Sequence, residues 1–386
     1  MTGRLRPGRR FALAAALAAM GSVQALALPT MIRLGYPNCV SCHYAPQGGG
    51  LLNQYGRGID EAQSRRAGEY KPTENLLVRT LSWDGRITQD FRVVAQEQLS
   101  GATGQPVIGK LRTRFMYRNV TELGRGFRFS GTAYGENESV PRPFKSYEPP
   151  VTPGNVYLAS AMVQYRRGDR FEIAAGRDQL PYGIFVSDQT SFVRSRNRQG
   201  YYDTPTQVKM FVWDKRYQVS PFFFAPSGEE KSGFGERGGG TLAEFDLLGN
   251  HKTIVGVSLL RGSSQKADRG LAGVYTRLGF GRWGIFAEHD VTDRTLREAS
   301  RATFRQHASY AQVFWAAREW FVISLVGERL TVEAPFREKL AAGKVEVAAR
   351  LTSQVSLGAS TRVQRNALTG QWGLSAALQL AMKTPN

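Results

Sequence analysis

The sequence predicts an all-β fold, a transmembrane antiparallel β-barrel of about sixteen strands. Three observations lead to this prediction. From about Leu76 to the C-terminus, segments of roughly ten residues alternate apolar and polar side chains and are separated by Gly, Asp, Asn or Pro. No apolar run in this region is as long as the roughly eighteen residues of a transmembrane helix. A secretory leader precedes the whole region.

The leader occupies residues 1–27. Four arginines precede an almost wholly apolar run over residues 11–27, which closes on Ala25-Leu26-Ala27. A short apolar run that ends on a small-x-small site is typical of a signal peptide, whereas a membrane anchor is longer. We therefore predict export and cleavage after Ala27.

The pentapeptide Cys39-Val40-Ser41-Cys42-His43 contains both cysteines of the chain and one of its four histidines. Two thiols at this spacing, followed at once by an imidazole, are the attachment signature of a c-type haem. We predict one covalent haem c. Cys39 and Cys42 would form its thioethers, and His43 would be the proximal ligand of the haem iron.

Three other interpretations of the pentapeptide remain open. A structural zinc site normally has four ligands, and no second Cys or Cys-His pair follows downstream. A redox CxxC motif needs a βαβ context, which the sequence does not show. A local disulfide is compatible with an exported protein, but it leaves His43 without a role.

Residues 28–75 form the predicted haem-binding segment. A turn at Gln47-Gly48-Gly49-Gly50 precedes apolar residues at helical spacing, which indicates one short helix that covers a haem face. An amphipathic linker is the alternative. A segment of this length buries too little surface to enclose a haem alone. The predicted barrel, residues 76–386, must therefore supply the rest of the haem site.

Alternation is clearest in residues 355–363 and 372–382, where every second side chain is mostly apolar and the others are mainly small or polar. One face would meet lipid and the other a water-filled lumen. In residues 110–118 the polar face carries charge, which predicts a lumen-facing row of arginines. The aromatic residues near predicted strand ends would form interfacial girdles, or else be ordinary sheet residues: Trp83, Tyr157, Trp213, Trp283 and Trp320.

Long loops alternate with short turns, as in outer-membrane barrels, where the long connections face outside. A soluble, secreted β-sandwich or barrel is the alternative, but its inner face would be packed rather than small and polar. Within one long loop, Arg194, Arg196 and Arg198 are expected in a solvated segment, although it could also fold inward. The predicted long loops are Asn137 to Asn155, Asp178 to Thr206, Pro226 to Gly238 and Thr292 to Thr303.

The layout resembles a known family. A leader, a single CxxCH, a glycine-rich turn, the stretch Leu52-Asn53-Gln54-Tyr55-Gly56-Arg57 and a barrel of about sixteen strands are together similar to the fused outer-membrane monohaem cytochrome-porins of iron-oxidising bacteria. The resemblance implies that the haem segment plugs the barrel and carries electrons across the outer membrane. It implies no distal ligand and no iron specificity for this chain.

The chain is strongly basic. Its formal net charge is +19, and removal of the four leader arginines leaves +15. Three explanations are open: an anion-attracting lumen, loops that bind lipopolysaccharide phosphate, and a docking surface for an acidic cytochrome. Nucleic acid is not an expected partner, because the chain is exported and contains no recognisable nucleic-acid module.

The distal iron ligand would determine the redox range, and the sequence leaves it open. Met116 and Met162 fall on predicted lumen faces, while His289 and His307 lie in strands whose orientation the sequence does not decide. Met31 is near in sequence but is equally well explained as part of the entry segment. A methionine that only fills a gap in the packing is the alternative at each Met position.

The leading functional hypothesis is a haem plug in an outer-membrane barrel that passes electrons between an extracellular donor or acceptor, such as iron, and periplasmic c-type cytochromes. Such a protein could be an oxidoreductase acting on extracellular metal. The alternative is a basic, anion-attracting solute porin in which the CxxCH segment is accessory. The sequence contains no hydrolase or transferase signature.

Overall fold

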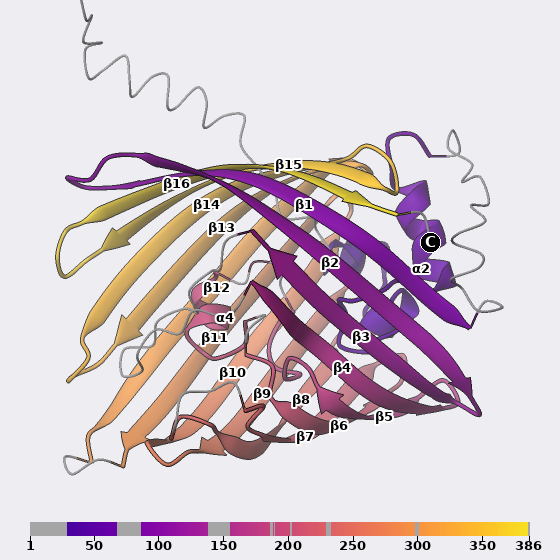
Figure 1. Cartoon of the computed structure of the whole chain (residues 1–386), viewed down its shortest axis with the longest axis horizontal. Coiled ribbons are helices and arrows are strands. Elements are labelled where there is room, and N and C mark those ends of the chain that lie inside the picture. Colours follow the sequence, from indigo (N-terminus) through magenta and orange to yellow (C-terminus); the bar gives the residue numbers. More distant parts are fainter. Residues whose placement is uncertain are drawn as a thin grey trace, which may run out of the picture.

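The computed structural model describes residues 29–67, 86–137, 155–185, 188, 190–200, 203–228, 233–297 and 301–384. The signal peptide, the predicted boundary after residue 75 and Trp83 lie outside these ranges. In the described residues, sixteen antiparallel strands form a closed barrel in which sequence neighbours pair and β1 closes on β16 (Figure 1). The predicted fold class and strand number are confirmed.

The strands follow one another around the barrel in chain order. Their bounds are β1 (Ile87–Ala102), β2 (Ile108–Gly124), β3 (Phe127–Glu136), β4 (Val156–Arg167), β5 (Phe171–Arg177), β6 (Thr206–Trp213), β7 (Tyr217–Ala225), β8 (Arg237–Asp246), β9 (Thr253–Ser263), β10 (Ala267–Phe280), β11 (Trp283–Leu296), β12 (Thr303–Arg318), β13 (Phe321–Val332), β14 (Glu338–Arg350), β15 (Val355–Asn366) and β16 (Trp372–Lys383).

Short helices make up the rest of the described secondary structure. They are the 3₁₀ helices η1 (Pro29–Leu34) and η2 (Cys39–Ser41) and the α-helices α2 (Gln54–Ala62) and α4 (Phe192–Ser195). None of the helices in the described residues is long and apolar enough to cross a membrane. In Figure 1, α2 lies at one end of the barrel. The helix α4 lies inside the barrel, against β11 to β13.

Side-chain alternation produces two faces on each strand, as predicted. On β16, Leu374 and Leu378 are exposed on the outside, whereas Gln379 and Ala381 are buried. On β2, the outward Phe115 is 58% exposed, and the inward Arg118 pairs with Asp90 of β1. The arginine row therefore faces the lumen.

Connections at the two ends of the barrel differ in length. The turns after even-numbered strands span two to six residues and lie at the end where β1 begins and β16 ends. In barrels of this type that end is periplasmic. At the opposite end, the connections between β5 and β6 and between β7 and β8 confirm the long loops predicted over residues 178–206 and 226–238, although β8 already begins at Arg237. The loop predicted over residues 137–155 lies almost wholly outside the described residues. The loop predicted from Thr292 is wrong at its start, because β11 continues to Leu296.

The expectation of a wet interior is wrong for one side of the barrel. Inward side chains of β8 to β14 form an apolar core with two inserted segments, residues 29–67 and the connection over residues 178–205. Phe286, Phe314 and Leu330 on the wall are fully buried and belong to one cluster with Ile32 and Phe192 from the inserted segments. The lumen is therefore packed along β8 to β14.

Two of the predicted girdle residues point into the barrel. Tyr157 stacks on Tyr134 in a buried cluster, and Trp213 is buried beneath Arg166, so the girdle prediction is wrong for both. Trp283 instead lies on the outer wall and stacks on a second exposed tryptophan, as a girdle residue would. Trp320 lies in the β12–β13 turn and lines a cavity at the periplasmic end.

Candidate haem-binding site

The CxxCH pentapeptide folds into one tight turn. The η2 helix places the backbone N–H groups of Cys42 and His43 on the carbonyl of Cys39, at 3.1 and 2.9 Å. His43 then forms an isolated antiparallel bridge with Leu52. The chain reverses through the glycine-rich turn between these two residues and brings α2 back beside the pentapeptide.

Asn53 connects α2 to the pentapeptide. Its side-chain oxygen accepts from the N–H of Gly56 at 2.8 Å and so caps the helix. Its amide nitrogen donates to the carbonyls of Val40 and Ser41 at 3.3 and 3.2 Å, and its backbone N–H donates to the carbonyl of Cys42 at 2.9 Å. One side chain therefore orders both the helix start and the CxxCH turn.

Two glycines allow the close packing of this unit. A Cβ at Gly56 would lie 2.1 Å from the carbonyl oxygen of Cys42, so only glycine lets α2 approach the pentapeptide this closely. Gly48 has φ +85°, and a Cβ there would lie 2.9 Å from the Sγ of Cys39. Within the stretch Leu52 to Arg57, the residues Leu52, Asn53 and Gly56 are thus explained by their contacts with the CxxCH turn.

The segment sits in the periplasmic mouth of the barrel and is bound to its short turns. Arg33 pairs with Glu319 of the β12–β13 turn, and Asn38 donates to the carbonyl of Asp214 in the β6–β7 turn at 3.0 Å. Asp60 of α2 pairs with two cations at the ends of strands: Arg350 at 3.0 Å and Lys383 at 2.7 Å. The predicted plug, of which the structure describes residues 29–67, is therefore fixed to the wall on several sides.

The inner tip of the plug contacts the inserted connection. Gln47 donates to Asp178 at 3.1 Å and accepts from Lys209 of β6 at 2.7 Å. At Gly49, an added Cβ would lie 2.9 Å from the ring of Phe185. The plug and the connection over residues 178–205 therefore meet inside the lumen.

A cavity with about 1340 Å³ of empty space, open to solvent, lies between the plug and the wall formed by β1, β2 and β13 to β16. Cys42 and His43 line it from the plug side. This volume includes space that is open to solvent at the mouth of the barrel. The pentapeptide therefore borders a solvent-open cleft between the plug and the barrel wall.

Charge around the cavity is unbalanced. Among the described residues that line it, five side chains are cationic, namely Arg33, Arg92, Arg118, Arg350 and Lys383, and three are acidic, namely Asp60, Asp90 and Glu319. The lining therefore has two more cationic than acidic groups. A ligand with two carboxylates would balance this excess.

Burial sets the protonation of the pentapeptide. It lowers the pKa of His43 to about 4, with a smaller contribution from the positive charge of Arg118. The imidazole is therefore neutral near pH 7, which is the form that binds metal. Burial raises the pKa of the Cys39 and Cys42 thiols. Redox CxxC motifs depend instead on a lowered thiol pKa, so the thiol chemistry disfavours that interpretation.

The residues present fit a c-type haem. Both cysteines are free, and within the described residues the buried Nδ1 of His43 has no hydrogen-bond partner. Cys42 and His43 face the cavity, while the Cys39 thiol lies against Gly48 and near Arg277. No three His, Cys, Asp or Glu side chains cluster as a metal-ion site in the part of the chain that the structure describes.

The four sequence candidates for a distal ligand lie elsewhere. Met116 lines a second cavity, behind the glycine turn, and Met162 is buried on β4 and lines neither of these cavities. His289 and His307 stack on each other on β11 and β12, at 5.8 Å between ring centroids. Both occupy outward positions of their strands, so the barrel wall separates them from the plug.

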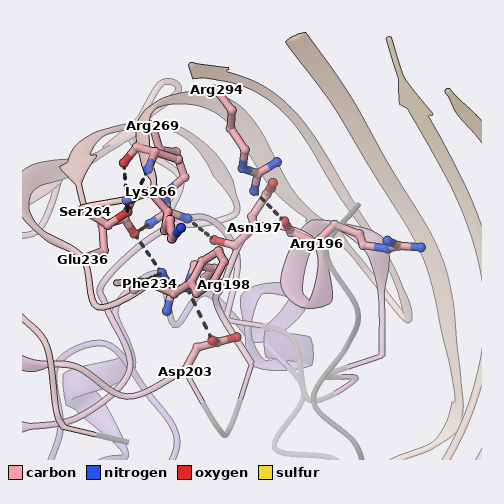
Figure 2. A network of polar contacts seen from close by, with 11 residues as sticks. Arg196, Asn197, Arg198, Asp203, Phe234, Glu236, Ser264, Lys266, Arg269 and Arg294 are labelled. Atoms are coloured by element: carbon pink, nitrogen blue, oxygen red, sulfur yellow. Dashed lines mark hydrogen bonds and ion pairs between the residues drawn. The ribbon is translucent and has the colours of Figure 1, made fainter. Parts of the chain in front are cut away.

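The arginine-bearing loop is not solvated as expected, because it folds inward. Asn197 is fully buried, and its side chain bonds Asp290, Thr292 and Gln306 of the wall. Figure 2 shows Arg269 joining the carbonyl of Asn197 to Glu236 of the connection between β7 and β8. The wall carboxylates and amides that receive this loop are far apart in sequence, which is why no local pattern revealed them.

The closed sixteen-stranded barrel with a short-turn end and a long-loop end decides the fold class. It is the porin-like fold of outer-membrane barrels. Among solved structures, the chain is similar to OmpT of Vibrio cholerae (TM-score 0.57, 9% identity, covering 78% of this chain and 98% of that one). It is also similar to an anion-selective porin from Comamonas acidovorans (0.56, 10%, 77% and 100%). A third is OprB of Pseudomonas putida in its high-pH structure (0.56, 10%, 80% and 96%). No family model and no curated protein matches the chain.

Proposed function

We propose that this protein is an outer-membrane electron-transfer protein with a single c-type haem in the periplasmic mouth of its barrel. The observation that carries the proposal is the pair of free thiols in one tight turn with His43, of which Cys42 and His43 line a cavity with an excess of cationic side chains. Cys39 and Cys42 would each add sulfur and proton across one vinyl group of haem, so attachment releases nothing. His43 would be the proximal ligand.

The bound haem would supply one-electron transfer, and the chain would supply position, charge and access. Asn53 and Gly56 hold the pentapeptide against α2. The excess of cations in the cavity lining would offset the two haem carboxylates. A hydrocarbon band about 25 Å tall separates the two faces of such a barrel, so a haem held by the plug is accessible to partners only through the mouth and the lumen.

The partners follow from this position. A periplasmic c-type cytochrome would meet the plug at the short-turn end, and an extracellular donor or acceptor, such as iron, would enter from the long-loop end. Export through the predicted signal peptide, cleaved after Ala27, would place the chain in the outer membrane, where lipopolysaccharide would surround it. The second iron ligand would tune the potential of the haem, and electrons would pass from the partner of lower potential to the partner of higher potential.

A basic solute porin is the second candidate. The net charge of the mature chain and the similarity to an anion-selective porin favour it. The packed side of the lumen and the plug in its mouth favour the electron-transfer proposal. The two functions differ in whether the intact protein carries covalent haem and in how well it conducts.

The experiment is to produce the full chain with c-type haem maturation and to isolate it from outer membranes. We expect a covalent haem signal at the mass of the mature chain on denaturing gels. The Cys39→Ala/Cys42→Ala variant should lose that signal while its heat-modifiable barrel band persists. Ser41→Ala, a change inside the same pentapeptide, should retain it. Wild-type protein without covalent haem would contradict the proposal.

A further inference from the structure

We infer that Met31 is the second axial ligand of the haem iron. This inference rests on the proposed function. Met31 belongs to η1 and lines the same cavity as Cys42 and His43, although it lies eight positions before Cys39 in the sequence. A thioether paired with an imidazole is the axial set of many c-type cytochromes.

Other ligating side chains around the cavity are few. Among the described residues that line it, the carboxylates Asp60, Asp90 and Glu319 are held in ion pairs. The remaining thioether and amine groups, besides Met31, belong to Met382 and Lys383. Met382 occupies an outward position on β16 and is 46% exposed on the outer wall. Lys383 is engaged in an ion pair with Asp60 at 2.7 Å. Met31 is the remaining thioether on the plug side.

The chain directly after Met31 is anchored. Ile32 is 1% exposed in the apolar core of the barrel, and Arg33 pairs with Glu319. The helix η1 packs directly on β10, since a Cβ at Gly279 would lie 2.6 Å from the Cα of Arg33. The position of Met31 is therefore tied to the barrel wall through the two residues that follow it.

The thioether is also connected to the proximal side of the site. The amide of Gln63, at the end of α2, donates to the Sδ of Met31 at 3.6 Å. Because α2 also packs on Cys42 through Gly56, Met31 and His43 belong to one packed unit. A sulfur atom accepts such a bond weakly and keeps a second lone pair for a metal.

A His/Met set raises the reduction potential relative to a bis-His set. The substrate class implied is therefore a high-potential, one-electron donor outside the cell. It would be oxidised by one electron, and the periplasmic cytochrome would be reduced by one. A low-potential external acceptor would require the opposite flow and fits this ligand set less well.

The test uses the full-length, haem-loaded protein in detergent. Oxidised wild-type protein should show the weak red absorption band of methionine bound to ferric haem. Met31→Leu should lose this band, lower the reduction potential and bind added imidazole, with the same haem content per barrel. Met31→His should restore a six-coordinate, low-spin spectrum without the band, which shows that the position itself reaches the iron.

Met382→Leu and Met116→Leu are the matched controls and should keep the band and the potential. A spectrum unchanged by Met31→Leu, or a band lost in Met382→Leu, would overturn the assignment of Met31 while the haem proposal stands. Absence of covalent haem from the wild type would overturn the proposed function and the assignment together.

Discussion

At the scale of single residues, the CxxCH turn depends on side chains that do no redox chemistry. Asn53 bonds Val40, Ser41 and the first turn of α2, and Gly56 lets the helix touch the carbonyl of Cys42. Each of these residues acts through backbone position. The pentapeptide is therefore ordered by the helix that follows it.

Two glycines of α2 offer a matched comparison. Gly56→Ala would place a methyl group 2.1 Å from the Cys42 oxygen, so the helix must move away from the pentapeptide. We expect covalent haem per protein to fall at least severalfold. At Gly58 an added Cβ meets nothing within 4 Å, so Gly58→Ala should keep full haem content and stabilise α2 by roughly 0.5–1 kcal/mol. Equal haem contents in the two variants would contradict this role of Gly56.

At the scale of elements, the connection over residues 178–205 behaves as part of the core. Its residues Leu180, Tyr182 and Val193 are each 1–2% exposed, and Arg194 donates to the carbonyl of Tyr182 at 3.0 Å within the same connection. Buried polar groups are stable only when they are paired. The wall supplies those partners, which converts a long loop into a filling for one side of the lumen.

Asn197→Ala tests this attachment. The substitution removes the hydrogen bonds of Asn197 to Asp290, Thr292 and Gln306. Asp290 keeps a bond from Tyr182, and Gln306 keeps one to the carbonyl of Arg196, whereas a buried group that loses its partner outright costs about 1–3 kcal/mol. We expect the connection to become cleavable by protease added to intact barrels, with haem content unchanged. Asn250→Ala, in the exposed β8–β9 turn, is the control and should leave cleavage as in the wild type. A protease-resistant Asn197→Ala barrel would show that the apolar contacts alone hold the loop.

At the scale of the whole molecule, plug and connection close the barrel from two sides. The plug occupies the periplasmic mouth and binds the short turns, while the connection packs along β11 to β13. Inward side chains near β1, β2 and β15 stay partly exposed. Any passage that remains for solutes through the lumen therefore runs along its arginine-bearing side.

Planar-bilayer conductance tests this arrangement. We expect the intact protein to conduct little and a chain without residues 28–75 to conduct several times more. The current should favour anions, because Arg112, Arg114 and Arg118 face the part of the lumen that the deletion opens. The full-length Cys39→Ala/Cys42→Ala variant is the control for loss of haem without loss of the plug. A large, steady anion current from the intact protein would favour the porin function instead.

The sequence by itself determined the barrel, its strand number and the position of the CxxCH motif. Period-two alternation, turn residues and CxxCH are local patterns, and local patterns can be found in a single chain. It also determined that Arg118 and its neighbours face inward, since alternation fixes the face of every side chain in a strand.

Only the tertiary structure decided what fills the barrel and what surrounds the pentapeptide. The packed lumen, the inward fold of residues 178–205 and the outward position of His289 and His307 all depend on contacts between distant segments. Met31 and Trp320 meet at one cavity because closure of the barrel brings the β12–β13 turn to the plug. Such contacts leave no periodic pattern in the sequence. They arise when the strands close into a barrel, and not from the order of residues within a single strand.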